Sequence, residues 1–322
     1  NGMTFIVLPR RNAPVVSCHT YANVGAWQEV AGCTGMAHLL EHMAFKGTPR
    51  VGSRDFPREA ALLDSVDEAF YELRSAQSAP SPTSSARLAA LSSRLQQLQA
   101  RAGQLAEPNA FGALLQAAGG VGLNATTSHD ATRYFVSLPA NKLELWMGLE
   151  AERFRAPVFR ELYSEKAVIE EERRLRVDST PMGRYQQDFS LAALANHYRR
   201  PVIGFEQDFA AIGRREVQAF FDTFYGPANL TVALVGDVQP EQVHRLAERY
   251  WGEWEGPPGY QVQPRGTSIW GVAQEGGGAA GAGGGQQPAT PDEGALGPLW
   301  GAGEEDPRPQ MLPLSRRVLP SK

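Results

Sequence analysis

Segments rich in β-branched and aromatic residues recur along the chain and predict the strands of a sheet. They are residues 3–8, 14–24, 132–138 and 229–237, with a further strand that begins at Asn124. The run at 229–237 is largely apolar, which is typical of a strand that is buried on both faces.

Apolar residues at helical spacing predict the remaining elements. These are helices at about 36–45, 55–76, 84–106, 142–154, 161–177, 184–197, 214–224 and 239–251. Gly47 and Pro49 follow the first helix and are stop signals. The mixed order of elements predicts an α/β fold of the α+β sandwich type, in which helices cover a mixed, largely antiparallel sheet.

The chain divides into a folded domain, residues 1–255, and a tail, residues 256–322. Within the domain, residues 55–106 predict an inserted helical hairpin with a Ser- and Pro-rich tip. Its outer faces are rich in Ser, Gln and Arg, so solvent exposure is expected, with a partner-binding arm as the alternative. The tail is rich in Gly, Ala and Pro and predicts a disordered linker. Residues 314–319 resemble the start of a strand, so we expect the linker to lead to a second domain that is missing here.

Composition excludes several classes of function. The chain has 322 residues, 42% hydrophobic and 20% charged, as in soluble globular proteins, and a formal net charge of −4 that indicates no nucleic-acid partner. Charged residues interrupt each apolar run, which predicts no membrane span. The two cysteines, Cys18 and Cys33, cannot form a disulfide framework. The compartment is not determined by these features, and a chloroplast or mitochondrion is only a hypothesis from the Ala-, Gly- and Pro-rich composition.

The pattern His-x-x-Glu-His at residues 38–42 is the clearest functional motif in the sequence. On a helix His38 and His42 leave the same face one turn apart, and Glu41 lies on the adjoining part of that face. Two neutral imidazoles at this spacing can bind zinc, and the carboxylate lies within reach of a water on the metal. The order is that of the inverted zincins, and the match predicts a zinc site.

A catalytic zinc held by two histidines needs a third protein ligand, and the helix predicted at 161–177 is rich in glutamates. At about 100° per residue, Glu165 and Glu172 share one side of this helix with Leu162, Val168, Ile169 and Leu175. This pattern predicts two carboxylates in the middle of an apolar stripe, where a metal or a hydrogen-bonded histidine would compensate their burial. Alternatively, they pair with buried arginines or lie at the wet end of the stripe.

At this point the chain resembles the pitrilysin/insulinase family of zinc metallopeptidases, which includes the mitochondrial processing peptidases. The matching segments are residues 38–48 and 122–128, Glu165 with Glu172, and residues 225–230, all in the family's order. The resemblance covers about residues 1–255. It implies one Zn²⁺ per chain, held by His38, His42 and Glu172.

The resemblance also implies roles for further residues. Glu41 is expected to be the general base that takes a proton from zinc-bound water, and Glu165 to support the site without binding the metal. Asn124 and Ala125 match the strand edge to which family members add an extended substrate peptide. The implied activity is hydrolysis of peptide bonds in extended or unfolded polypeptides.

Two features of the chain depart from the family. Glu172 follows His42 by 130 residues, more than in compact members, and the hairpin can absorb the excess. The family also completes its substrate site with a second homologous domain or subunit, which cannot be located in this chain. A non-catalytic subunit or scaffold that retains the peptidase fold is therefore the alternative function.

Overall fold

The protein is described by a computed structural model that places residues 1–81, 83–194 and 196–262. The expected linker therefore lies largely outside the described residues, as does the strand start expected at 314–319. The boundary near residue 255 remains a prediction.

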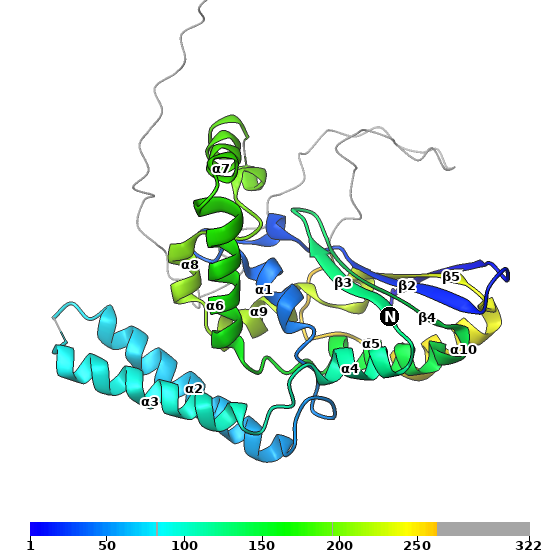
Figure 1. The fold of residues 1–322 in the computed structure, drawn as a ribbon, viewed down its shortest axis with the longest axis horizontal. Helices are drawn as coiled ribbons and strands as arrows, with labels where there is room; N and C mark the ends of the chain where they lie inside the picture. The colour runs from blue at the N-terminus through cyan, green and yellow to red at the C-terminus, as the bar shows by residue number, and fades with distance from the viewer. Residues whose placement is uncertain (82, 195, 263–322) are drawn as a thin grey trace, which may run out of the picture. The chain divides into compact units, whose positions relative to one another are not determined.

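Five strands form a single mixed sheet with the order β1-β5-β2-β4-β3. They are β1 (Thr4–Pro9), β2 (Val15–Ala22), β3 (Val121–Thr127), β4 (Thr132–Pro139) and β5 (Leu230–Gly236). Only β1 and β5 are parallel, and the other neighbours are antiparallel, as predicted. Strand β3 forms one edge of the sheet and pairs with β4 alone among the described strands (Figure 1).

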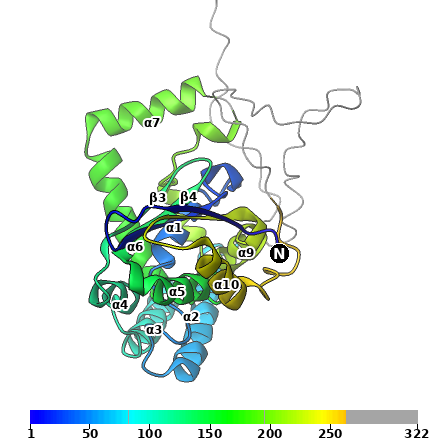
Figure 2. The same cartoon turned by 90° about the vertical axis from the view of Figure 1, so that its right-hand side faces the viewer.

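The sheet has one buried and one open face. In β2, alternate residues Val16, Cys18, Thr20 and Ala22 are fully buried, because strand side chains alternate between faces. Helices α1 (Met36–Met43), α5 (Leu143–Arg155) and α10 (Pro240–Trp251) cover this face (Figure 2). The covered face of the sheet therefore supports α1, the helix that contains His38 and His42.

The helices confirm the predicted α+β architecture. They are α1 (Met36–Met43), α2 (Phe56–Gln77), α3 (Ser85–Gly103), α4 (Ala110–Ala117), α5 (Leu143–Arg155), α6 (Leu162–Arg173), α7 (Pro181–Ala193), α8 (Glu206–Ala211), α9 (Arg214–Phe224) and α10 (Pro240–Trp251). Helices α4 and α8 were not predicted, because each is only one or two turns long and its periodicity is weak. The helix expected at 161–177 changes at Arg174 to a π-helical turn, Arg174–Asp178. No helix in the described part of the chain is long and apolar enough to span a membrane.

Helices α2 and α3 form the predicted hairpin (Figure 1). The side chains of Asp55 and Ser84 cap their N-termini by accepting hydrogen bonds from backbone N–H groups. The two helices pack through Val66, Phe70 and Leu95, which belong to one small apolar cluster. The hairpin therefore has its own core, which allows it to be an insertion that leaves the sheet undisturbed.

Arg160, in the segment between α5 and α6, holds together three parts of the chain. Its guanidinium donates to the backbone carbonyls of Lys46, Thr48 and Val51 and forms an ion pair with Glu59 at the start of α2. Arg160 is 2% exposed and Glu59 1%. Each buried charge is thus compensated by a partner, and the loop after α1 is fixed to α2 and α6.

Replacing Arg160 by Met should lower the free energy of unfolding by about 3–5 kcal/mol, because it leaves the Glu59 carboxylate and the carbonyls of Lys46 and Thr48 buried without the donor described here. The measurement is urea unfolding followed by circular dichroism. The control is Arg50→Ala, on the same loop, whose ion pair with Glu152 involves a side chain that is 84% exposed. This control should change stability by no more than about 0.5 kcal/mol. Equal losses in the two variants would contradict the proposed contribution of Arg160.

Candidate metal centre

Helix α1 carries the His-x-x-Glu-His pattern and is capped by a residue from outside the helix. The two carboxylate oxygens of Glu29 accept hydrogen bonds from the backbone N–H groups of Gly35 and Ala37, each at 2.9 Å. A carboxylate at a helix N-terminus satisfies otherwise unpaired donors and interacts favourably with the helix dipole. Gly35 has φ +83° and lies so close to Phe209 that a Cβ would be 2.6 Å from its ring. Glycine is therefore required where the chain enters α1.

His38, His42 and Glu172 come together as the sequence predicted. Glu172 Oε2 lies 3.8 Å from His38 Nε2 and 3.7 Å from His42 Nε2. One ligand atom from each residue falls within 4.8 Å of the others, which makes this the one cluster of three such donors among the described residues. Two imidazole nitrogens and a carboxylate oxygen are a donor set that suits zinc. The residues present therefore fit the metal that the sequence predicted.

Glu165 contacts a proposed ligand, His42. Its Oε2 lies 3.2 Å from His42 Nδ1, and its Oε1 lies 2.6 Å from Lys46 Nζ. The hydrogen bond with His42 lowers the pKa of Glu165 against the opposing effect of burial, and Lys46 lowers it further. A carboxylate that accepts from Nδ1 leaves the Nε2 lone pair of His42 directed toward Glu172 and a metal.

Glu41 lies beside the cluster and contacts the edge strand. Thr127, at the end of β3, donates its hydroxyl to Glu41 Oε2 at 2.5 Å. Burial raises the pKa of Glu41 above its ordinary value, although the Thr127 hydrogen bond opposes this. A carboxylate with a raised pKa next to a metal site is a suitable proton acceptor.

The environment of α6 differs from the predicted apolar stripe. Val168 and Leu175 are 51% and 56% exposed, whereas Lys166 and Arg173 are buried. Lys166 donates to the carbonyl of Ile212 and Arg173 to that of Gly204, so both aliphatic stems pack inward while their charged ends are bonded. Leu162 and Ile169 are buried as the stripe predicted, so the prediction was wrong for Val168 and Leu175 only. Hydrophobic spacing does not reveal tertiary acceptors for a buried cation.

The two glutamates consequently lie at the edge of the buried side of α6, where the side chains of Glu165 and Glu172 are 15% and 18% exposed. Glu172 Oε1 pairs with Arg176 at 2.5 Å, and Arg176 is itself 73% exposed. The alternative that both carboxylates pair with buried arginines is therefore not what the structure shows. Arg176 holds one oxygen of Glu172, and the other faces the two histidines.

The electrostatics favour a neutral His38. Burial lowers the pKa of His38 to about 4, with further contributions from the charges of His42 and Arg176. Neutral imidazole is the form that binds a metal, so His38 is available as a ligand over the whole neutral range.

Asn124 and Ala125 lie on the edge strand, on the same strand as Thr127. Asn124 is exposed, whereas the side chain of Ala125 is buried. The Asn124 side-chain oxygen accepts a hydrogen bond from the Ala125 N–H at 2.8 Å, and the register of β3 against β4 is irregular between Val121 and Asn124. The strand is thus in the expected position, and substrate contact by these two residues remains a prediction.

Sequence reasoning did not assign four residues that organise the site. They are Glu29, Lys46, Thr127 and Arg176. Lys46 and Thr127 lie within the matched segments, and Arg176 is four residues after Glu172, a spacing that brings helical side chains together. Glu29 gave no local signal, because the donors it caps are six and eight residues away.

Comparison with protein families gives two matches. A model described as insulinase (peptidase family M16) matches residues 5–74 and 103–203, more than half of the chain. A model described as the peptidase M16 inactive domain matches residues 211–276. All the proposed metal ligands lie in the first match, and residues 75–102 of the hairpin are left unmatched.

Curated relatives include zinc proteases from bacteria. The chain is 26% identical over 255 residues to the zinc protease PqqE of Helicobacter pylori, an alignment that covers 78% of this chain and 45% of that protein. It is 25% identical over 255 residues to the probable zinc protease PqqL of Escherichia coli, covering 76% and 22% respectively. The chain spans less than half the length of these relatives.

Solved structures have a similar fold. A protease from Helicobacter pylori superposes with a TM-score of 0.61 at 24% identity and covers 82% of this chain and 51% of that one. The first half of the periplasmic protease PqqL from Escherichia coli gives a TM-score of 0.58 at 22% identity, covering 83% and 47%. At these identities the likeness establishes the fold.

In the metal-free protein, His38 should titrate with a midpoint near the pKa of about 4 that its burial produces. The measurement is an NMR titration of the imidazole protons in the presence of a chelator. The unfolded chain takes up a proton at His38 from about pH 6.5 downward and the folded chain does not, so the stability contribution of this group falls as the pH drops from 6.5 toward 4.

The matched variant is Arg176→Gln, which removes one nearby positive charge and should raise the His38 midpoint. A wild-type midpoint at or above 6.5 would show that His38 is not shielded from water as described.

Proposed function

Because the chain belongs to the insulinase family of peptidases, family M16, we propose that it is the metal-binding domain of a zinc metalloendopeptidase. The observation that supports this most directly is the convergence of His38, His42 and Glu172 next to Glu41. The proposed substrates are extended or unfolded polypeptides.

His38, His42 and Glu172 would hold the zinc. When bound, the metal supplies a Lewis acid that makes a water molecule more acidic and polarises the scissile carbonyl. Thr127 occupies Oε2 of Glu41, which leaves Oε1 to take the proton from the attacking water and to pass it to the leaving amine. Glu165 and Lys46 would keep the His42 ring in its orientation.

Strand β3 would bind the substrate. It ends at Thr127, whose hydroxyl reaches Glu41, so a peptide aligned along this edge would pass beside the metal centre. Main-chain hydrogen bonds to an open strand edge bind extended peptides with little dependence on sequence. Asn124 and Ala125 are the proposed contact residues.

The proposed domain comprises residues 1–255, and residues 256–322 would connect it to a second homologous domain that closes the site. Relatives of which the match covers only about half the length support this arrangement. The match of residues 211–276 to the inactive-domain model favours one other candidate function, that of a non-catalytic subunit or scaffold. The retention of Glu41 and all three ligand positions supports the peptidase.

Purified protein should contain about one zinc ion per chain by atomic emission spectrometry, because three protein donors suffice for a catalytic site. His38→Ala should lose most of this metal. The control is His244→Ala, on α10, whose side chain is 73% exposed and remote from the cluster. A native protein without zinc after reconstitution, or equal loss in both variants, would refute the metal site.

Glu41→Gln should retain zinc and reduce cleavage of an unfolded polypeptide by about 100-fold or more, because it removes the proton acceptor. The rate is measured with a quenched fluorescent peptide, for the chain alone and for the longest natural polypeptide that contains it. Glu170→Gln is the matched control, since Glu170 is exposed on α6 and is absent from the ligand cluster. Zinc binding without any Glu41-dependent cleavage in either form would favour the scaffold function.

A further inference from the structure

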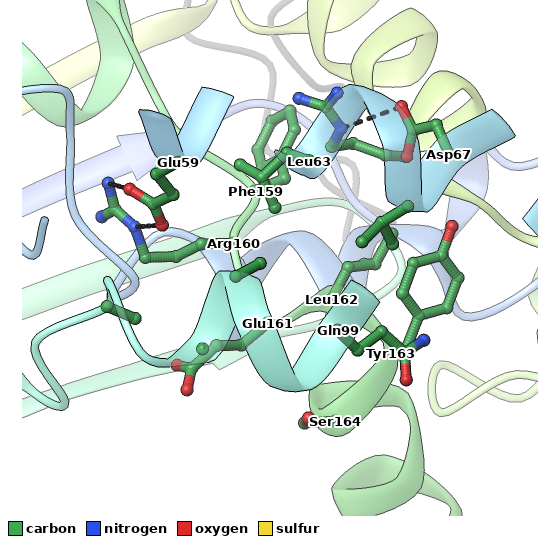
Figure 3. A pocket seen from close by; sticks show the side chains of 15 residues that line it. Glu59, Leu63, Asp67, Gln99, Phe159, Arg160, Glu161, Leu162, Tyr163 and Ser164 are labelled. Carbon is green, nitrogen blue, oxygen red and sulfur yellow. Dashed lines mark hydrogen bonds and ion pairs between the residues drawn. The ribbon is translucent and has the colours of Figure 1, made fainter. Parts of the chain in front are cut away.

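A cavity of about 70 Å³ lies at the base of the helical hairpin, where α2 and α3 meet the start of α6 (Figure 3). It is separate from the metal centre, whose ligands do not line it. Six of its fifteen lining residues are apolar: Leu63, Val66, Ala102, Ala106, Phe159 and Leu162. The cavity therefore offers an apolar environment to a small molecule.

Two polar atoms at this cavity have no hydrogen-bond partner among the described residues. They are Oδ1 of Asp67 and the hydroxyl of Tyr163, and both residues line the cavity. Asp67 is 7% exposed, and in Figure 3 the Tyr163 hydroxyl points toward its carboxylate. Buried polar groups are normally hydrogen-bonded, so each of these two atoms is expected to have a hydrogen-bond partner.

Asp67 shares its cationic partner with a second carboxylate. Arg214 pairs with Asp67 Oδ2 at 2.9 Å, and it also pairs with Asp64 at 2.6 Å. The other charged residues that line the cavity have partners of their own, Glu59 for Arg160 and Lys46 for Glu161. Burial raises the pKa of Asp67, and the positive charges of Arg214 and Arg215 oppose this shift.

The unmatched part of the hairpin contributes to the cavity. Gln99 and Ala102 of α3 line it, and both fall within the unmatched residues 75–102. The opposite wall, residues 159–164, leads directly into the helix that carries Glu165 and Glu172. The other lining residues fall within the segments that the family models match.

We propose that this cavity binds a small primary amine with a short apolar chain. An ammonium group has three N–H donors, of which one would bond Asp67 Oδ1 and a second the Tyr163 hydroxyl oxygen. The chain would pack against Leu63, Val66 and Leu162. The volume is about half that of a 150 Å³ cavity known to hold the six carbons of benzene, which corresponds to about three non-hydrogen atoms, an ammonium nitrogen and two carbons.

The probe is ethylammonium, titrated into the zinc-loaded protein in a potassium chloride background and followed by two-dimensional NMR. We expect saturable shifts confined to residues around the cavity. Acetate and ethanol have the same number of carbons with a negative or a neutral head, and both should bind at least about tenfold more weakly. Equal binding of ethanol, or shifts spread over the surface, would overturn the proposal.

Variants distinguish loss of ligand recognition from loss of folding. Asp67→Asn should weaken ethylammonium binding about tenfold or more, and Tyr163→Phe should weaken it by a smaller factor. Glu68→Gln is the matched control, because it removes an exposed carboxylate of the same helix that does not line the cavity, and it should leave binding unchanged. Ala102→Leu should abolish binding by filling the space. Unchanged affinity in folded Asp67→Asn or folded Ala102→Leu protein would refute the site.

Discussion

The burial of helix α1 is the constraint on which the rest of the site depends. Six of its eight residues are buried, and Glu41 and His42 are the two that are not. Its N-terminus is held by the carboxylate of Glu29, and the loop after it is held by the guanidinium of Arg160. A helix fixed at both ends cannot rotate, so its imidazoles keep one direction relative to α6. The metal centre is thus rigid because the helix is part of the core.

Much of this arrangement could be predicted from local pattern. The spacing of His38 and His42 requires only a helix to place both rings on one face, and the structure brings Glu172 to them. The sheet and the hairpin were also predictable, because their strands and helices are long and regular. Short helices such as α4 and α8 carry too few turns for periodicity to identify them.

The environment of α6 could not be predicted, because it depends on acceptors from distant parts of the chain. Lys166 and Arg173 look like surface residues in the sequence, yet carbonyls of Ile212 and Gly204 bind them in the interior. For the same reason, the sequence did not reveal that Glu29 caps α1, because the cap depends on a loop that folds back on this helix. Residues of this kind support the site through tertiary contacts, for which a single sequence provides no signal.

The open edge of β3 has a consequence for the solution behaviour of the protein. Unpaired N–H and C=O groups along a strand edge accept any extended chain, including the same edge of another copy, and so favour aggregation. Two features blunt this tendency: the Asn124 side chain already occupies the Ala125 N–H, and the register irregularity after Val121 interrupts the ladder. The edge that is proposed to receive a polypeptide is therefore interrupted among the described residues, which limits self-association.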